Sequence, residues 1–398
     1  MIRPDEPTEA APTRTVTVVG AGNIGSFLIP LLGRMGRIGH VTIIDRDVYE
    51  QKNLTVQDIS GGDVGKPKAE VQARRLKRLF PWVEAEAIVA SAADVPLGRY
   101  RSDLLLMCLD SKAARQDVHR PGYRLGMVMI DAGVNATAGM LARVTVYVPG
   151  PGSACLECGW SQRDYDALEQ ARPCLDGRIE ATPTNSPSCL GALAASLQAI
   201  EAGKHLNGEA GGLSGGQEVV LDVQSQAHCV TALRPDPACR FDHQVWEIEP
   251  IRPGAGQITL GEAMDLGGAD RLGGPATIEL EGQPFVRTLQ CTECGQVRLT
   301  LRLLGRLRLS DRRCRRCGRK MTPLGADMAG RLGRASVARR TLDKSLKSIG
   351  FEDGDVLTVM GRSGAAGHFE LGGGPGRTRD GNCRQNGQKE RHRDGRNL

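Results

Sequence analysis

Aromatic residues are scarce in this sequence, at 4% of its 398 residues, and no apolar run approaches the length of a membrane span. Because a span needs about 20 mostly apolar residues, we expect no transmembrane helix. The N-terminal residues 1–14 carry acids and lack an apolar stretch, which excludes a secretory signal and predicts a disordered lead-in. With 40% hydrophobic and 25% charged residues, the composition is typical of a globular protein, which we expect to be cytoplasmic with two to three domains.

Most of the chain also lacks an excess of positive charge, because the basic residues behind the formal net charge of +6 are concentrated in two segments. Residues 291–320 hold ten Arg or Lys against two acids, and residues 377–398 hold seven against three. The rest of the chain is therefore net negative, which excludes a nucleic-acid surface over the whole protein. We expect no membrane partner, and nucleic acid stays an alternative only for the basic module.

A glycine-rich turn stands between a strand and a helix near the N-terminus. Residues 15–19 predict a buried strand, and GAGNIG places Gly20, Gly22 and Gly25 directly after it. A helix and a second strand ending at Asp45 follow, which is typical of a doubly wound sheet whose loop binds a phosphate. An acid at Asp45 can bind the ribose of NAD or of ATP, so the loop leaves both nucleotides open.

Further apolar or alternating runs predict the rest of an α/β domain. We expect a helix over 67–79, strands over 103–110, 127–134 and 142–148, a small-residue helix over 188–206, and a helix end, turn and strand over 345–360.

Three stretches resemble the ThiF/HesA/MoeB family and the adenylation domains of ubiquitin-activating enzymes. They are IDRDVYEQKNLTVQ (44–57), DVGKPKAE (63–70) and CLDS (108–111), in the order and spacing of the family's motifs. With the glycine loop and a later CxxC, the resemblance covers roughly residues 15–245. It implies a homodimeric adenylyltransferase that uses ATP and Mg²⁺ to activate the C-terminal carboxylate of a ubiquitin-like or sulfur-carrier protein ending in Gly-Gly.

The resemblance also assigns roles to individual residues. Lys68 would contact phosphate oxygens, Asp110 would hold Mg²⁺, and Asp45 would take the ribose; all three suit a reaction between anions. The expected nucleotide-binding residues are Gly20, Gly22, Gly25, Asp45, Asp47, Asn53, Gln57 and Lys68.

Two departures from the family pattern concern cations. Val56 stands where the family has Arg, and neither Arg3 nor Arg14 lies in a motif that matches the family's upstream Arg. Arg115 or Lys66 are the residues that we expect to compensate. The alternatives are a catalytically silent nucleotide-binding scaffold and an NAD(P)-dependent oxidoreductase, although the latter does not explain GKPKAE.

The twelve cysteines include two clusters with metal-ligand spacing. The family uses two CxxC pairs for a structural Zn²⁺, and here Cys155, Cys158, Cys239 and His243 would form the set, with Asp242 as the rival fourth ligand. Cys291, Cys294, Cys314 and Cys317 form C-x₂-C-x₁₉-C-x₂-C, a zinc-ribbon pattern in which the intervening residues predict a hairpin about Gly305.

A reactive cysteine downstream of the first CxxC is a further expectation from the resemblance. Cys174 is the nearest residue that could take the activated carrier, and Cys189 is the next. Cys108 lies in a predicted strand and is expected in the core.

The predicted architecture is α/β, with a doubly wound Rossmann-like sheet, a zinc-binding crossover region, a zinc ribbon and a small α+β module. The expected segments are 1–14 (lead-in), 15–250 (adenylation domain), 251–290 (linker or extension), 291–320 (zinc ribbon), 321–371 (α+β module) and 372–398 (disordered basic tail).

Overall fold

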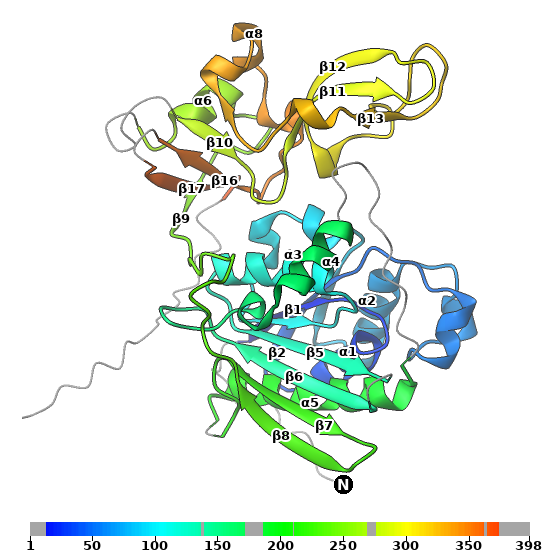
Figure 1. Cartoon of the computed structure of the whole chain (residues 1–398). Coiled ribbons are helices and arrows are strands. Elements are labelled where there is room, and N and C mark those ends of the chain that lie inside the picture. Colours follow the sequence, from blue (N-terminus) through cyan, green and yellow to red (C-terminus); the bar gives the residue numbers. More distant parts are fainter. Residues whose placement is uncertain are drawn as a thin grey trace, which may run out of the picture.

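The computed structural model describes residues 13–136, 139–171, 186–209, 211–268, 276–361 and 364–373. Figure 1 shows a larger α/β domain with a smaller C-terminal part above it. We call the described residues of 248–373 the C-terminal module. In the described part of the chain, no helix is long and apolar enough to cross a membrane. Most of the predicted lead-in and most of the predicted tail lie outside the described residues.

One sheet in the order β3-β2-β1-β4-β5-β6-β7-β8 forms the centre of the larger domain. The first five strands in that order are parallel, and β6, β7 and β8 continue the sheet antiparallel. The predicted α/β class is confirmed, with a mixed sheet. The strands are β1 (Arg14–Val19), β2 (Ile38–Ile44), β3 (Glu84–Ile88), β4 (Leu104–Met107), β5 (Met129–Asn135), β6 (Leu141–Tyr147), β7 (Gln217–Asp222) and β8 (Ala227–Ala232).

Helices cover both faces of this sheet. On β4, Leu104 and Leu106 face one core and Leu105 and Met107 face the other, because successive side chains of a strand point to opposite sides. Helices α1, α2 and α5 pack on the first face and α3 packs on the second. The helices are α1 (Gly25–Leu32), α2 (Lys68–Leu79), α3 (Lys112–Arg124), α4 (Gln162–Ala171) and α5 (Ser188–Asn207).

The C-terminal module contains a five-stranded sheet in the order β15-β10-β16-β17-β9 and a smaller sheet in which β11 pairs with β12, β13 and β14. Residues 251–290, expected as a linker or extension, contribute β10 and nearly all of β11 to these sheets and also form the helix α6. The elements are β9 (Ile248–Ile251), α6 (Leu260–Asp265), β10 (Thr277–Glu279), β11 (Phe285–Cys291), β12 (Val297–Leu303), β13 (Met321–Pro323), β14 (Met328–Ala329), β15 (Leu332–Gly333), α8 (Arg339–Leu342), β16 (Val356–Met360) and β17 (Ala366–Leu371).

The expected hairpin about Gly305 is wrong. β12 pairs antiparallel with β11 instead, so the hairpin turns at the first CxxC rather than at Gly305. Gly305 lies in the 3₁₀ turn η6 (Leu304–Arg306), which follows β12. Residues 285–291 pair with β12 in place of the residues after Gly305, because the short turn at the first CxxC joins these two strands directly.

Candidate functional site

A glycine loop joins β1 to α1 at the carboxyl ends of the parallel strands. Gly20 has a φ of +95°, and a Cβ on it would fall 2.3 Å from the carbonyl oxygen of Cys108. A Cβ on Gly25 would fall 2.0 Å from the carbonyl oxygen of Gly20. On Gly22 the nearest atom would be Nε2 of Gln57 at 3.9 Å. Packing therefore requires glycine at positions 20 and 25, whereas Gly22 leaves room for a ligand.

Asp45 follows β2 and holds this loop in place. Its carboxylate accepts hydrogen bonds from the backbone N–H of Ala21 at 2.7 Å and of Asp47 at 2.8 Å. Burial raises the pKa of Asp45, and the positive charge of Lys68 opposes that rise. One carboxylate thus links the glycine loop to the end of β2.

Polar side chains from four other positions surround the loop. Lys68, the first residue of α2, is buried with its Nζ 3.4 Å from Oδ2 of Asp47. Asn53 is buried in the 3₁₀ turn η1 (Gln51–Thr55), and Asp110 is exposed beyond the end of β4. Oε1 of Gln57 is buried and has no hydrogen-bond partner among the described residues. A ligand hydroxyl or amino group would satisfy that acceptor.

One cavity of about 1320 Å³ connects these groups. Small-molecule sites commonly measure about 300–1000 Å³, so this cavity has room for a nucleotide and part of a second reactant. Gly25 lies behind Gly20 and does not line it. The predicted residues that do are Gly20, Gly22, Asp45, Asp47, Asn53, Gln57, Lys68 and Asp110.

The cations expected to compensate for Val56 differ in their position. Arg115 lines the cavity, and its Nε also donates to a buried carboxylate of β5 at 2.9 Å. Lys66 is exposed and, like Val56, does not line the cavity. Arg14 begins β1, so it lies at the opposite end of the strand from the glycine loop. Arg3 lies outside the described residues.

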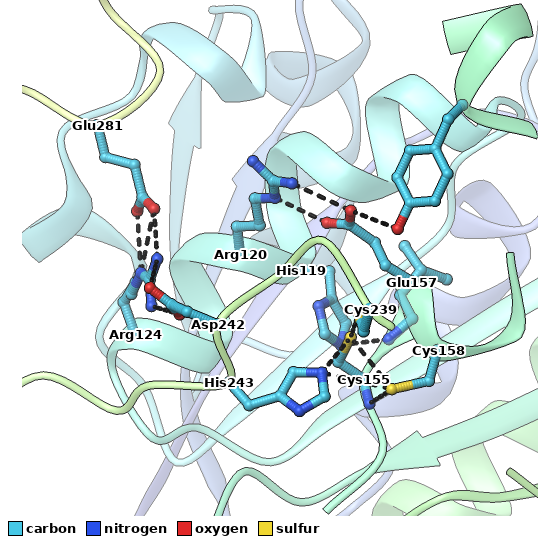
Figure 2. Close-up of polar contacts among 12 residues, drawn as sticks. His119, Arg120, Arg124, Cys155, Glu157, Cys158, Cys239, Asp242, His243 and Glu281 are labelled. Carbon is cyan, nitrogen blue, oxygen red and sulfur yellow. Dashed lines mark hydrogen bonds and ion pairs between the residues drawn. The ribbon is translucent and has the colours of Figure 1, made fainter. Parts of the chain in front are cut away.

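The first cysteine cluster lies beside α3, on the face of the sheet that α3 covers (Figure 2), and Cys155 is buried in the same core as Tyr123 of α3 and Tyr147 of β6. The four predicted ligands offer atoms that all lie within 4.8 Å of one another: Cys155, Cys158, Cys239 and His243. Nε2 of His243 is 3.1 Å from Sγ of Cys155 and 3.3 Å from Sγ of Cys158. The set is three thiols and one imidazole, which suits Zn²⁺.

The rival ligand Asp242 points away from the cysteines (Figure 2). Its carboxylate forms an ion pair with Arg124, with Nη2 and Oδ2 at 3.1 Å. Arg124 also binds Glu281 of the C-terminal module, with 2.7 Å between Nη2 and Oε1. This pairing lowers the pKa of Asp242 against the opposing effect of burial. The geometry therefore favours His243 over Asp242 as the fourth ligand.

Side chains of α3 fix the backbone that carries the first two cysteines. Nε2 of His119 accepts the backbone N–H of Leu156 at 3.2 Å, and burial lowers the pKa of His119 to about 3, so the imidazole is neutral. Arg120 donates to both carboxylate oxygens of Glu157, at 2.7 and 3.0 Å. The hydroxyl of Tyr165 donates to the same carboxylate at 3.2 Å. Such outer contacts orient metal ligands.

The second cluster brings together Cys291, Cys294, Cys314 and Cys317, again with all ligand atoms within 4.8 Å. Their Sγ atoms are separated by 3.5 Å between Cys291 and Cys317 and by 3.6 Å between Cys294 and Cys314. The backbone N–H of Cys317 lowers the pKa of Cys314 to about 6. A thiolate is the form that binds metal, so this cluster also suits Zn²⁺.

The remaining cysteines divide into buried and exposed groups. Cys108 is in the core, where burial raises its pKa and its thiol donates to Oε1 of Gln198 at 3.3 Å. Cys189 is exposed in the first turn of α5. Cys174 lies outside the described residues.

Sequence reasoning missed one wall of the cavity. Gln283, Gly305 and Arg306 of the C-terminal module line it together with residues that follow β3. These residues are about 190 positions or more from the loop after β3 that they contact. A short motif cannot predict a contact between residues so far apart in the sequence. No other pattern in residues 251–290 indicated that they reach the cavity.

A comparison with protein-family models matches the description "ThiF family" over residues 4–240. Among curated relatives, an adenylyltransferase and sulfurtransferase UBA4 of Yarrowia lipolytica is 34% identical over 36% of this chain and 36% of its own. The sulfur carrier protein ThiS adenylyltransferase of Escherichia coli is 26% identical over 48% of this chain and 72% of its own.

The overlap with known proteins is partial. The chain covers 36%, 58% and 39% of the first three curated relatives. Among solved structures, E. coli MccB in complex with ATP is 23% identical, with a TM-score of 0.47, over 57% of this chain and 65% of that chain.

Proposed function

We propose that this chain, which belongs to the ThiF family, is an ATP-dependent adenylyltransferase that activates the C-terminal carboxylate of a small ubiquitin-like or sulfur-carrier protein. The observation that carries the proposal is the single cavity that joins the glycine loop, Lys68 and Asp110. Both relatives described above are named adenylyltransferases, and the E. coli relative is named for the sulfur carrier protein ThiS. The carrier would end in Gly-Gly, and the active form would be a homodimer.

The reaction joins two anions, so the site must position them and balance their charge. A carboxylate oxygen of the carrier attacks the α-phosphorus of ATP. The bond from that phosphorus to the β-phosphate oxygen breaks, and pyrophosphate leaves with the bonding electrons. The products are an acyl adenylate and pyrophosphate.

We assign the residues of this chain as follows. Backbone N–H groups of the glycine loop and Nζ of Lys68 bind phosphate oxygens. Asp45, whose carboxylate keeps lone pairs beyond its two backbone hydrogen bonds, accepts from the ribose. Asn53 and Gln57 supply neutral hydrogen bonds, and Asp47 orients Lys68. Asp110 holds Mg²⁺, which supplies charge neutralisation to the phosphates.

Both cysteine clusters are proposed to hold structural Zn²⁺. The donor sets are Cys₃His and Cys₄, with no position left for a substrate, which is typical of closed sites. The Cys₃His site anchors the loop after β8, and the Cys₄ site closes the tip of the β11–β12 hairpin. We also propose residues 291–320 as the zinc ribbon and an adenylation domain that begins at residue 15 and, instead of reaching residue 250, ends before β9, since β9 starts at Ile248 and pairs with β17.

The central variant is Asp110→Ala. We expect carrier-dependent ATP–pyrophosphate exchange to fall at least about 100-fold, because one charge-stabilising group is removed from the site. The matched control is Asp166→Ala, since Asp166 is an exposed acid of α4 that does not line the cavity. Near-normal exchange in Asp110→Ala with an unchanged circular dichroism spectrum would sink the assignment.

A silent nucleotide-binding scaffold is the second candidate, and Val56 favours it. This position leaves the cavity without the cation that the resemblance predicts there, although Arg115 lies in its wall. ATP binding by the unmodified chain without any pyrophosphate exchange would support the scaffold.

Cys174 is proposed to receive the activated carrier as a thioester: its thiolate attacks the carbonyl carbon of the acyl adenylate, and AMP leaves with the electrons of the broken acyl–phosphate bond. Asn23 of the glycine loop donates to the carbonyl oxygen of Ser186 at 3.0 Å, so the described chain resumes beside the nucleotide cavity. Cys174 precedes Ser186 by twelve residues, which can span up to about 40 Å. The thiol is therefore within chain reach of the cavity.

For this step the informative variant is Cys174→Ala, with Cys189→Ala as the matched control. Pyrophosphate exchange should stay near its original rate, because adenylation does not use the thiol. A reductant-sensitive adduct between the chain and the carrier, seen by intact-mass measurement, should disappear only in Cys174→Ala. An adduct that survives this substitution refutes the role of Cys174.

A further inference from the structure

We infer that the C-terminal module closes the base-binding end of the nucleotide cavity, so that the affinity for ATP depends on a module outside the adenylation domain. This inference rests on the proposed function, since it needs a nucleotide in the cavity. The C-terminal module would then be the part of the chain that recognises the base, since none of the adenylation motifs provides a residue for the base.

The order of the strands sets the direction in which a nucleotide lies. The glycine loop that takes the phosphates follows β1, and Asp45 that takes the ribose follows β2. The next strand in the sheet is β3, so the base lies over the loop that follows β3. Residues 90–95 of that loop line the cavity.

The C-terminal module touches this same loop through Gln283, which is buried. Nε2 of Gln283 donates to the carbonyl oxygen of Ala93 at 2.8 Å, and its Oε1 accepts the backbone N–H of Gly305 at 2.9 Å. Nε2 also lies 3.2 Å from Oδ1 of Asp94. One side chain therefore connects the η6 turn of the module to the loop after β3.

Arg306 makes the second contact. Its Nη2 donates to the carbonyl oxygen of Asp94 at 3.1 Å, and its guanidinium pairs with the buried Asp355 at 2.8 and 2.9 Å. The side chain of Arg306 is 8% exposed, and its Nε has no hydrogen-bond partner in the described part of the chain. A purine or pyrimidine edge carries ring nitrogens and carbonyl oxygens that accept from such a donor.

The surfaces on either side of this junction suit a flat ring. Ala90 and Val95 line the cavity from the loop after β3, and Pro284 and Leu304 line it from the module. Apolar walls with a few polar groups at the edge are what small-molecule sites use to hold a planar ligand. The phosphate end, by contrast, is lined by Lys68 and the glycine loop.

The module is also attached away from the cavity, which provides a control. Nη2 of Arg101 lies 2.8 Å from Oε2 of Glu370, and the backbone N–H of Gly98 donates to the carbonyl oxygen of Gly354 at 2.8 Å. None of these four residues lines the cavity. Weakening the Arg101 contact loosens the module without changing the base end.

Two variants of the full chain test the inference. Gln283→Ala removes the bonds to Ala93 and Gly305. Gly305→Ala forces the turn away from the loop, because a Cβ there would fall 2.3 Å from Oδ1 of Asp94 and 2.7 Å from Oε1 of Gln283. Arg101→Ala is the control. Isothermal titration calorimetry with ATP and with inorganic tripolyphosphate measures binding with and without a base.

We expect the Kd for ATP to rise about tenfold in Gln283→Ala and further in Gly305→Ala, in line with the loss of one to several hydrogen bonds. The Kd for tripolyphosphate should stay within about twofold of the original in both, and Arg101→Ala should bind both ligands normally. An equal loss for ATP and tripolyphosphate, or no loss of ATP binding, overturns the inference. Absence of ATP binding by the unmodified chain would instead overturn the proposed function, and the inference with it.

Discussion

Two adjacent residues, Asp242 and His243, have separate roles in this molecule. His243 takes a left-handed φ of 54°, which turns its ring towards Cys155 and Cys158. A positive φ is uncommon for a residue with a Cβ, and it is tolerated where the surroundings fix it. Asp242 instead pairs with Arg124, which also binds the C-terminal module.

His243→Ala should therefore remove one of two zinc equivalents per chain, because three thiols without the imidazole leave the first site incomplete. Asp242→Ala should keep both equivalents, since its carboxylate is not among the ligand atoms. Elemental analysis of protein purified without chelator measures the stoichiometry. If Asp242→Ala lost one zinc equivalent while His243→Ala kept both, the assignment of the fourth ligand would be reversed.

At the same scale, short motifs were informative about the cavity. Lys68 and Asp110 could be assigned to the cavity from the sequence, because each belongs to one of the short motifs whose order along the chain matches the family pattern. Gln283 and Arg306 could not, because they reach the cavity through contacts across about 190 residues or more of sequence. A lone Gln or Arg outside any motif carries no local signal of that contact.

At the scale of elements, the spacing of apolar residues predicted helices and strands correctly where a segment is buried on one or both faces. The strand over 15–19 and the helices over 67–79 and 188–206 match β1, α2 and α5 to within one residue at either end. All three are rich in buried apolar or small residues, so their pattern follows directly from packing.

Elements whose side chains face solvent were harder to predict. All six residues of β8 are exposed and those of β7 are half-buried, so neither strand shows a clear alternation of apolar and polar residues. The pairing of β7 with β6 and of β8 with β7, not a local pattern, makes these segments strands.

At the scale of the whole molecule, the α/β domain and the C-terminal module meet at the cavity. The α/β domain has a core on each face of its sheet, and the C-terminal module has a core of its own beside a sheet that combines β9 and β10 with β16 and β17. The segment with the four cysteines, 291–320, thus lies between β10 and β16 along the chain, two strands that pair in the sheet of the module. This arrangement brings the η6 turn of that segment to the cavity.

The central claim is that the chain forms an acyl adenylate on a carrier protein, and intact-mass spectrometry of the carrier tests it most directly. The chain is incubated with ATP, Mg²⁺ and a β-grasp carrier ending in Gly-Gly from the same organism, with a carrier lacking its terminal glycine as the control. The account predicts AMP on the intact carrier alone and its loss in Asp110→Ala. A carrier that stays unmodified while the chain binds ATP, or that stays unmodified while the chain binds NAD(P) in its place, would contradict the account.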